Sequence, residues 1–367
     1  MKRKKSAFWI VCVMAGLLAG CASIGPSTVN RDRFDYVKAL SDSWGKQLLL
    51  NIVMLRYADT PVFLEVGQVI SGYELEGTIS AGGAIGEKSW RNAGGALGDF
   101  VNLNAGGRYL DRPTVTYSPL TGPDFIKTMM TPFPPDSVMF LIEAGWPVDI
   151  VLRMGTQAVN GLKNQKAGPY GHRADPAFID LLGLLQKIQL SGGIGMTVEK
   201  AKDGEAASSL LLFHTRHLTA ETAQDVSTVR RLLNLPPEAM SIKITYGPEA
   251  RGDKEISLHT RSGFQLMAEL AAQVSVPPEH LAEHRTDASQ AAGGGELEFV
   301  LPPLVSVQSG KAQPENSFVQ VKHRDHWFWI DDRDFKPKRS FSFLMMLFTL
   351  SESGQKVQAP ILTIRAN

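Results

Sequence analysis

The sequence predicts an α+β fold: an N-terminal amphipathic helix and a long Gly-rich β-hairpin, then a C-terminal half of alternating helices and antiparallel hairpins. Apolar residues first recur every three or four positions, as in a helix, and then every second position, as in a strand. Beyond residue 175 the two periods alternate, which is typical of an antiparallel sheet covered by helices. With 43% hydrophobic and 20% charged residues among 367, the composition is that of a globular protein long enough for two domains.

The first twenty residues have the organisation of a secretory signal peptide. Four basic residues, Lys2 to Lys5, precede an apolar run from Ala7 to Ala19. This run is shorter than the ~20 residues that a membrane-spanning helix needs, as expected for a signal that a peptidase removes. The tetrad "LAGC" ending at Cys21 resembles the lipobox of bacterial lipoproteins. The resemblance implies a signal peptide over residues 1–20 and acylation of Cys21. We expect a linker over residues 21–30.

Acylation of Cys21 would attach the chain to a membrane. Three acyl chains anchor a protein durably, whereas one binds only marginally. In lipoproteins an aspartate after the lipidated cysteine is associated with retention in the inner membrane, and this chain has Ala22 there. The resemblance therefore implies a lipid-anchored protein of the outer membrane, with the periplasmic face as the expected side.

Removal of the signal also changes the thiols and the charge. Cys12 leaves with the signal, so Cys21 is the remaining cysteine and no disulfide can form within a monomer. Loss of the four basic residues lowers the formal net charge from +1 to −3. A near-neutral to acidic chain without a clustered basic face gives no reason to expect a nucleic-acid partner. The sequence also lacks the glycine motifs of nucleotide-binding loops, so we expect no cofactor.

Residues 31–165 are expected to form a helix, a hairpin and further short helices. Apolar residues from Phe34 to Leu55 follow helical spacing, and the helix should end at residues 59–61. Between residues 66 and 117 the period becomes two, with a loose glycine-rich tip between Gly86 and Gly98, as in a long hairpin with one apolar face. The two or three short helices that follow are broken by Pro132, Pro134, Pro135 and Pro147.

Residues 176–367 are expected to form a second, α+β domain after a boundary at residues 164–175 that is rich in Gly, Pro and charge. Helices are predicted over residues 176–190, 220–233, 262–274 and 339–352. Strands are predicted near residues 195–199, 209–213, 241–246, 254–259, 297–301, 317–322 and 327–330, with a last one around Leu362.

Two short motifs match the residue order of known catalytic sites, but the surrounding sequence lacks the other elements that those sites need. "HLAEH", His280 to His284, has the order of inverted zinc peptidases, but it runs into a loop, and a short exposed helical turn is the favoured interpretation. "SWGK", Ser43 to Lys46, lacks the K-T-G element of penicillin-binding enzymes and fits the polar side of the first helix.

Two H-x-x-H pairs offer further candidate ligands. They are His214 with His217 and His323 with His326, and together they could supply four nitrogen ligands to a metal. Residues three apart on a strand point to opposite faces, so neither pair chelates unless it lies in a turn. Strand-end histidines are therefore the favoured interpretation.

The stretch "HWFWIDDRDFKPKRSFSFLMML", residues 326–347, combines many chemically able side chains. Asp331, Asp332 and Asp334 lie within four residues and are a weak candidate for a calcium site. Aspartates also suit strand ends, turns and helix caps, so a strand-turn-helix joint is favoured. Trp327 and Trp329, on the predicted strand before this joint, form a candidate binding surface.

Three stretches together resemble a set of proteobacterial predicted lipoproteins. They are "FDYVKALSDSWGKQLLLNIVMLRYADTPVFLEV", "PTVTYSPLTGPDF" and "WFWIDDRDFKPKRSFSFLMMLF", and the resemblance covers most of the chain after Cys21. It implies a shared fold and no activity, so it assigns no functional residue.

Three hypotheses for function remain. The leading one is a non-enzymatic binding or envelope-assembly role, with an envelope protein or polymer as partner. The alternative is a subunit of a homo-oligomeric outer-membrane channel or secretion complex that contributes the 66–117 hairpin, an anatomy similar to that of the curli secretion channel family. The third is a hydrolase of an envelope polymer, acting through paired carboxylates that the sequence does not identify.

Overall fold

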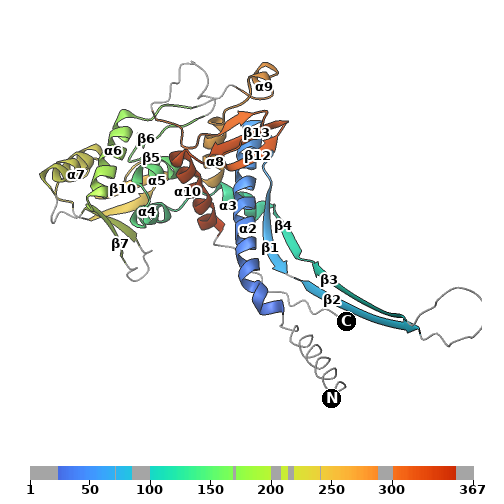
Figure 1. The fold of residues 1–367 in the computed structure, drawn as a ribbon. Coiled ribbons are helices and arrows are strands. Elements are labelled where there is room, and N and C mark those ends of the chain that lie inside the picture. The colour runs from blue at the N-terminus through green and yellow to red at the C-terminus, as the bar shows by residue number, and fades with distance from the viewer. Residues whose placement is uncertain are drawn as a thin grey trace, which may run out of the picture. The chain divides into compact units, whose positions relative to one another are not determined.

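A computed structural model describes residues 24–70, 72–84, 100–167, 171–199, 208–213, 219–239, 241–287 and 301–352. The predicted α+β class is confirmed, because helices and several sheets with antiparallel pairing make up these residues (Figure 1). The chain divides into two compact units. The first consists of residues 1–41 and 64–119, and the second of residues 42–63 and 120–367.

This division differs from the boundary predicted at residues 164–175. That segment lies inside the second unit, where local hydrogen bonds hold the parts that the structure describes. Lys166 and His172 exchange two backbone hydrogen bonds of 3.0 Å, and the Asp175 carboxylate accepts one of 2.7 Å from the backbone of Lys163. Composition predicted a boundary because Gly and Pro favour turns, whereas the described residues of the segment are hydrogen-bonded within the second unit.

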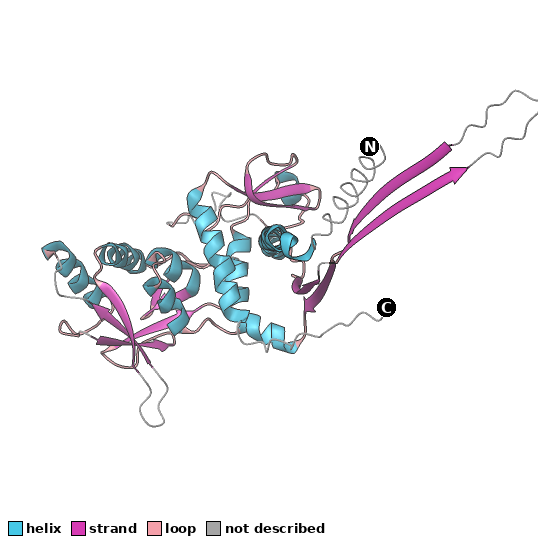
Figure 2. Cartoon of the chain, turned by 60° about the horizontal axis from the view of Figure 1, so that its bottom comes forward, coloured by secondary structure: helices cyan, strands magenta, loops and turns pink. Residues whose placement is uncertain are grey.

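The first unit contains the predicted hairpin. β1 (Phe63–Ile70) pairs with β4 (Thr114–Leu120), and β2 (Tyr73–Ala84) pairs with β3 (Phe100–Asp111). The β2–β3 register is antiparallel and continuous from Tyr73 opposite Asp111 to Ala84 opposite Phe100, so the two strands form the long ribbon visible in Figure 2. The loose tip predicted between Gly86 and Gly98 lies outside the described residues.

α2 (Ile24–Arg56) is the predicted first helix, with different ends. It begins at Ile24, inside the expected linker of residues 21–30. Pro26 does not prevent this early start, because in the first turn of a helix proline removes no intrahelical hydrogen bond. It ends before the predicted stop at residues 59–61. Ala58 has a φ of 58°, and the N–H of Asp59 bonds back to the carbonyl of Met54, which is the hydrogen bond of a Schellman cap.

A six-stranded sheet forms the centre of one part of the second unit. Its order is β6-β5-β10-β9-β8-β7. The strands are β5 (Thr156–Val159), β6 (Leu162–Lys163), β7 (Ile194–Glu199), β8 (Ser208–Phe213), β9 (Ser241–Tyr246) and β10 (Glu255–Thr260). The helices are α4 (Pro135–Glu143), α5 (Val148–Gly155), α6 (Pro176–Leu190) and α7 (Ala220–Leu232). α4 and α5 contact the sheet, and α6 packs against both α5 and α7.

One strand pair of this sheet differs from the prediction of antiparallel hairpins. β9 and β10 run parallel, with Lys243 opposite Glu255 and Tyr246 opposite Leu258. The connecting residues must therefore return along the length of the strands. Gly247 has a φ of 155°, and its carbonyl accepts a 2.7 Å hydrogen bond from the hydroxyl of the buried Ser257, which fixes the start of this return. Strand spacing alone could not reveal the direction of the second strand.

A three-stranded sheet and its helices form the other part of the second unit. The sheet order is β11-β13-β12, with β11 (Gln308–Gly310), β12 (Ser317–His323) and β13 (His326–Asp331). The helices are α3 (Pro123–Met130), α8 (Gly263–Ala272), α9 (Pro278–Ala282) and α10 (Phe335–Glu352). Phe328 of β13 and both Phe341 and Phe343 of α10 are fully buried, so this sheet and α10 belong to the hydrophobic core.

Local sequence signals explain where many helices begin. α3, α4, α6 and α9 each start at a proline, whose fixed φ suits the first helical position. α8 starts with a complete capping box between Ser262 and Gln265. The strands predicted around residue 362 and over residues 297–300 lie outside the described residues.

Candidate functional site

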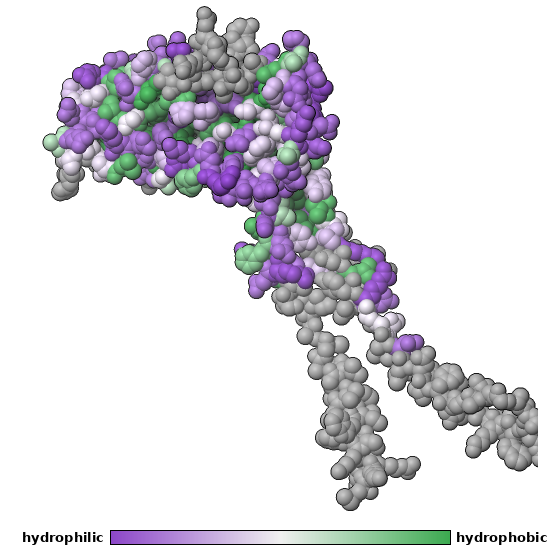
Figure 3. All heavy atoms as spheres, turned by 45° about the horizontal axis from the view of Figure 1, so that its top comes forward, coloured by the Kyte–Doolittle hydropathy of each residue, from purple (hydrophilic) through white to green (hydrophobic). Residues whose placement is uncertain are grey.

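The hairpin of the first unit exposes apolar side chains. Most residues of β1 and β4 are exposed, including Leu64 at 45% and Tyr117 at 60%. The face of the second unit shown in Figure 3 is instead mainly hydrophilic, with hydrophobic residues in small groups. An isolated two-stranded ribbon is marginally stable in water, because neither of its faces is covered.

The two faces of the β1–β4 ribbon differ in polarity. A Cβ atom at Gly67 would lie 3.7 Å from Oγ of Ser118, so these two positions share a face. Since successive residues of a strand point to opposite faces, that face is polar or small over most of its length. The opposite face carries Leu64, Val66, Ile70, Val115 and Tyr117. The ribbon is therefore amphipathic.

The register of β2 and β3 continues this alternation. From Leu75 to Gly83, every second pair combines apolar residues or glycine, as in Leu75 opposite Tyr109 and Ile79 opposite Ala105. Most of the intervening pairs are polar or small, as in Glu76 opposite Arg108 and Ser80 opposite Asn104. Alternate pairs of a ladder belong to opposite faces, so the pattern predicted from the sequence holds along both strands.

The hairpin also has unpaired edges. Each of its two ladders contains only two strands among the residues that the structure describes. Within the described residues no third strand pairs with β2 from Glu74 onward or with β3, so their outer edges are open to another strand, which is the usual route of edge-to-edge association. At the base of the ribbon, the Tyr73 hydroxyl donates to the Asp32 carboxylate, and Arg31 lies 5.7 Å from the centre of the Tyr73 ring.

The proposed lipid attachment site, Cys21, lies outside the described residues. Within the described part of the chain, no helix combines the length and the apolar character that crossing a membrane requires.

The structure brings together histidines that belong to different sequence motifs. The Tyr57 hydroxyl lies 2.7 Å from Nδ1 of the buried His280, and the rings of His280 and His326 are 4.7 Å apart. His326 Nε2 lies 3.0 Å from the Glu279 carboxylate, and His323 Nε2 lies 3.1 Å from the Asp59 carboxylate. We refer to these six residues as the Tyr–His cluster. Sequence reasoning missed it, because its members come from three segments far apart in the chain.

The protonation of the Tyr–His cluster does not favour base or nucleophile chemistry. Burial raises the pKa of Tyr57 to about 12, so the phenol stays protonated. Burial also lowers the pKa of His280 and of His323, which keeps both imidazoles neutral near pH 7. Tyr57 and a neutral His280 therefore share a buried hydrogen bond, whose main effect is to join the end of α2 to α9.

The motif histidines that the structure describes do not form a metal site. His280 is buried on α9, which corrects the exposed turn predicted for "HLAEH", whereas the exposed His284 follows the helix with a φ of 54°. His323 and His326 are opposite each other across a two-residue turn of positive φ, and each bonds to a different carboxylate. No group of three His, Cys, Asp or Glu residues in the described segments could hold a metal ion. His214 and His217 lie outside those segments.

Asp331, Asp332 and Asp334 form the predicted strand-turn-helix joint. The Asp331 carboxylate accepts hydrogen bonds from the backbone and the guanidinium of Arg333, and these bonds lower the pKa of Asp331 to about 2. Lys338 Nζ lies 2.5 Å from the Asp332 carboxylate. The Asp334 carbonyl accepts from the N–H of Lys338 in the first turn of α10. The carboxylates of Asp331 and Asp332 thus form ion pairs with basic residues close by in the sequence.

The two candidate tryptophans lie on the outer side of β13. Trp327 and Trp329 are half-buried, and they alternate with the buried Phe328 and Ile330. The ring of Trp329 covers Gly310 of the neighbouring strand, where an added Cβ atom would lie 3.3 Å from the indole. Ser43 and Lys46 are both exposed on α2, in agreement with their predicted place on its polar side.

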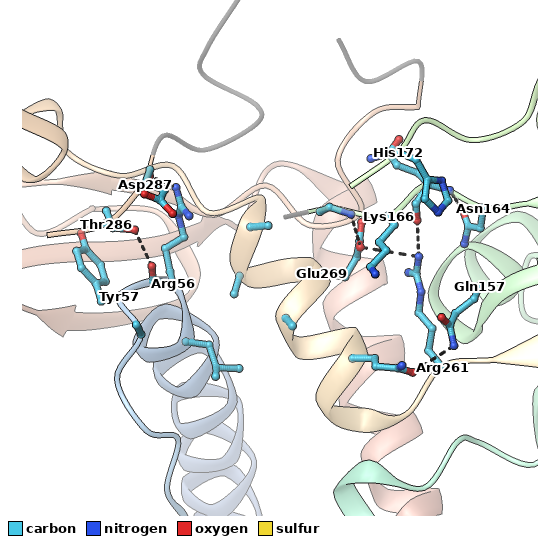
Figure 4. A pocket seen from close by; sticks show the side chains of 18 of the residues that line it. Arg56, Tyr57, Gln157, Asn164, Lys166, His172, Arg261, Glu269, Thr286 and Asp287 are labelled. Carbon is cyan, nitrogen blue, oxygen red and sulfur yellow. Dashed lines mark hydrogen bonds and ion pairs between the residues drawn. The ribbon is translucent and has the colours of Figure 1, made fainter. Parts of the chain in front are cut away.

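The second unit also contains a pocket above α8 (Figure 4). Its volume is about 640 Å³. It is lined by the end of α2, by one face of α8, and by residues 157, 164–167, 172 and 284–287. Three arginines are among the lining residues, and Figure 4 shows two of them, Arg56 and Arg261, on either side of α8. No sequence pattern predicted this pocket, because its residues share no motif.

Comparison of the chain with protein families, with curated protein sequences and with solved structures gives no match.

Proposed function

We propose that this protein is a lipid-anchored subunit of a homo-oligomeric outer-membrane assembly, in which the hairpins of neighbouring subunits join edge to edge. The observation that carries the proposal is the hairpin itself, an amphipathic ribbon with open edges and exposed apolar residues. A folded protein rarely exposes such a surface unless a partner covers it. A strand from a second copy would satisfy the unpaired backbone groups.

The hairpin favours a ring over a two-fold dimer. Its two outer edges belong to different strands, β2 on one side and β3 on the other. Pairing of β2 with β3 of the next subunit is a head-to-tail contact, which closes into a ring and leaves no edge open. In such a ring every apolar face points to one side and every polar face to the other, as a channel in a membrane requires.

The length of the strands fits this role. β2 and β3 each contain 12 residues. At roughly 3.3 Å per residue each strand is about 40 Å long, and a tilted strand needs only about 9–11 residues to cross a bilayer. Acylation at Cys21 would hold each subunit at the membrane in which the hairpins assemble. In broader terms, we propose a non-enzymatic role in the cell envelope, of which the oligomeric assembly is the specific case.

The native mass of the detergent-extracted protein tests the proposal. We expect one discrete oligomer by light scattering. A variant in which residues 78–106 are replaced by an Asn-Gly turn should be monomeric, because the ribbon then loses most of its length. The matched control is Ser227→Cys in α7, an exposed position of the second unit, which should keep the oligomer. A monomeric natural chain, or an oligomer that survives the shortening, would contradict the proposal.

The anchor has its own test. Radiolabelled palmitate should be incorporated into the natural chain and lost in Cys21→Ser. Labelling that persists in this variant would show that Cys21 is not the attachment site.

A further inference from the structure

We propose that the pocket above α8 binds a small organic anion, a phosphate or carboxylate group attached to an apolar body. The pocket volume of about 640 Å³ lies within the range of roughly 300–1,000 Å³ that is usual for small-molecule sites. The pocket lies wholly within the second unit. The inference is therefore independent of the assembly proposed for the hairpin.

The charges around the pocket favour an anion. Four cationic side chains line it, and they are Arg56, Lys166, Arg261 and Arg285. Two carboxylates, of Glu269 and Asp287, line it as well, so basic groups exceed acidic ones. Cations that are partly removed from water attract an anion more strongly than exposed ones do, because the local dielectric constant is low.

Arg56 has a donor that an anion could satisfy. Its Nη2 donates to the backbone carbonyl of Asp287, and its own carbonyl accepts a 2.6 Å hydrogen bond from Thr286 Oγ1, so the residue is held in place. Its Nε is buried and has no hydrogen-bond partner in the described part of the chain. Buried donors are nearly always paired. A bound carboxylate or phosphate oxygen would supply the missing acceptor.

Arg261 lies on the other side of α8 and is only 4% exposed. Its guanidinium donates to the carbonyls of Arg153 and Gln165, which are neutral groups. The Glu269 carboxylate is 3.9 Å away, too far for a hydrogen bond. That carboxylate instead accepts hydrogen bonds from the N–H of Ala167 and the amide of Gln273. Arg261 and Glu269 thus form a buried ion pair without a direct hydrogen bond, so Arg261 adds less to the attraction for an anion than the more exposed cations of the pocket do.

The floor of the pocket accounts for the apolar body. α8 presents Ala268, Ala271 and Ala272 to the cavity, and Leu55 of α2 lies at its edge. Methyl side chains leave room above the helix, which lies between Arg56 and Arg261 in Figure 4. A ligand with its charge near an arginine would therefore lay its carbon skeleton on these alanines.

Calorimetric titration of the full-length protein in neutral detergent tests the inference, with phenyl phosphate and phenylacetate as probes. We expect at least one probe to bind saturably. Benzyl alcohol, which lacks the anionic group, and inorganic phosphate, which lacks the apolar body, should bind at least about tenfold more weakly. Arg56→Gln should weaken binding at least about tenfold. Ala268→Phe should abolish binding by filling the cavity, and since Ala268 is exposed this variant keeps its fold.

Two control variants separate the pocket from general surface effects. Arg251→Gln removes an exposed cation outside the pocket, and Ala223→Phe adds a ring on the exposed side of α7. Both should leave the dissociation constant within about twofold. Absence of saturable binding by both anions, unchanged binding in Ala268→Phe, or equal weakening in Arg251→Gln would each overturn the inference.

Discussion

The hairpin of the first unit and strand β13 of the second have the same two-residue alternation and different surroundings. In β13 one face is buried, with Phe328 and Ile330 at 0% exposure, and the other carries the half-buried tryptophans. In the β1–β4 ribbon the apolar face is exposed, with Tyr117 at 60%. Alternation therefore identifies which residues share a face, while the element that covers that face must be found separately. For β13 it is the core of the same chain. For the hairpin we propose that the membrane covers the apolar face, while a second copy pairs with the strand edges.

The largest expected effect comes from truncating one ring in each region. Phe328→Ala should lower the free energy of unfolding of the second unit by about 3–5 kcal/mol, because it leaves a cavity in a closed core. Tyr117→Ala should change that free energy by no more than about 0.5 kcal/mol, as usual for an exposed site. Urea denaturation followed by circular dichroism measures both. Similar losses of unfolding free energy in the two variants would show that the rings of Phe328 and Tyr117 do not differ in burial.

A smaller loss is expected from the Tyr–His cluster. Tyr57→Phe removes the hydroxyl that is hydrogen-bonded to His280 and leaves a buried ring nitrogen unpaired, which costs about 1–3 kcal/mol. Tyr246→Phe is the matched control, since Tyr246 is 53% exposed and should lose almost nothing. Equal stability of the two variants would show that the buried hydrogen bond has no net effect.

The same cluster should make the second unit sensitive to acid. The folded pKa values of His280 and His323 lie below the unfolded value of about 6.5, so the unfolded chain binds more protons below that pH. The free energy of unfolding should therefore fall as the pH drops through 6.5, and His280→Gln should reduce this fall. Glu279, whose pKa is lowered to about 2 by hydrogen bonds with its own backbone and with Lys311, adds a further loss below pH 4.5. Stability that stays constant between pH 7 and 5 would contradict this assignment.

Much of the second unit was predictable, because its signals are local. The bounds of α6 match the prediction to the residue, since Pro176 marks its start and apolar residues recur through Leu190. The strand-turn-helix joint at Asp331 was predictable for the same reason. The parallel direction of β10, the Tyr–His cluster and the pocket were not, because each depends on segments far apart in the chain. Tyr57, His280 and His326 meet only after three separate elements have packed.

The smallest expected effect lies at the Asp331 joint. Asp331→Asn removes an ion pair with Arg333, whose side chain is 74% exposed, so solvent screening should keep the loss of stability below that of Tyr57→Phe. Thermal denaturation at low and high salt measures it. A loss as large as that of Tyr57→Phe would show that the joint does more than turn the chain.

The most direct test of edge-to-edge assembly is cross-linking between two single-cysteine variants. Thr78→Cys in β2 is co-expressed in turn with Asn104→Cys, Gly106→Cys or Arg108→Cys in β3, and the membranes are oxidised. Because the proposed contact joins β2 of one subunit to β3 of the next, we predict a disulfide-linked dimer in at least one mixture and none in any variant expressed alone. Absence of the dimer from all three mixtures, or a dimer of equal yield from Thr78→Cys alone, would contradict the account.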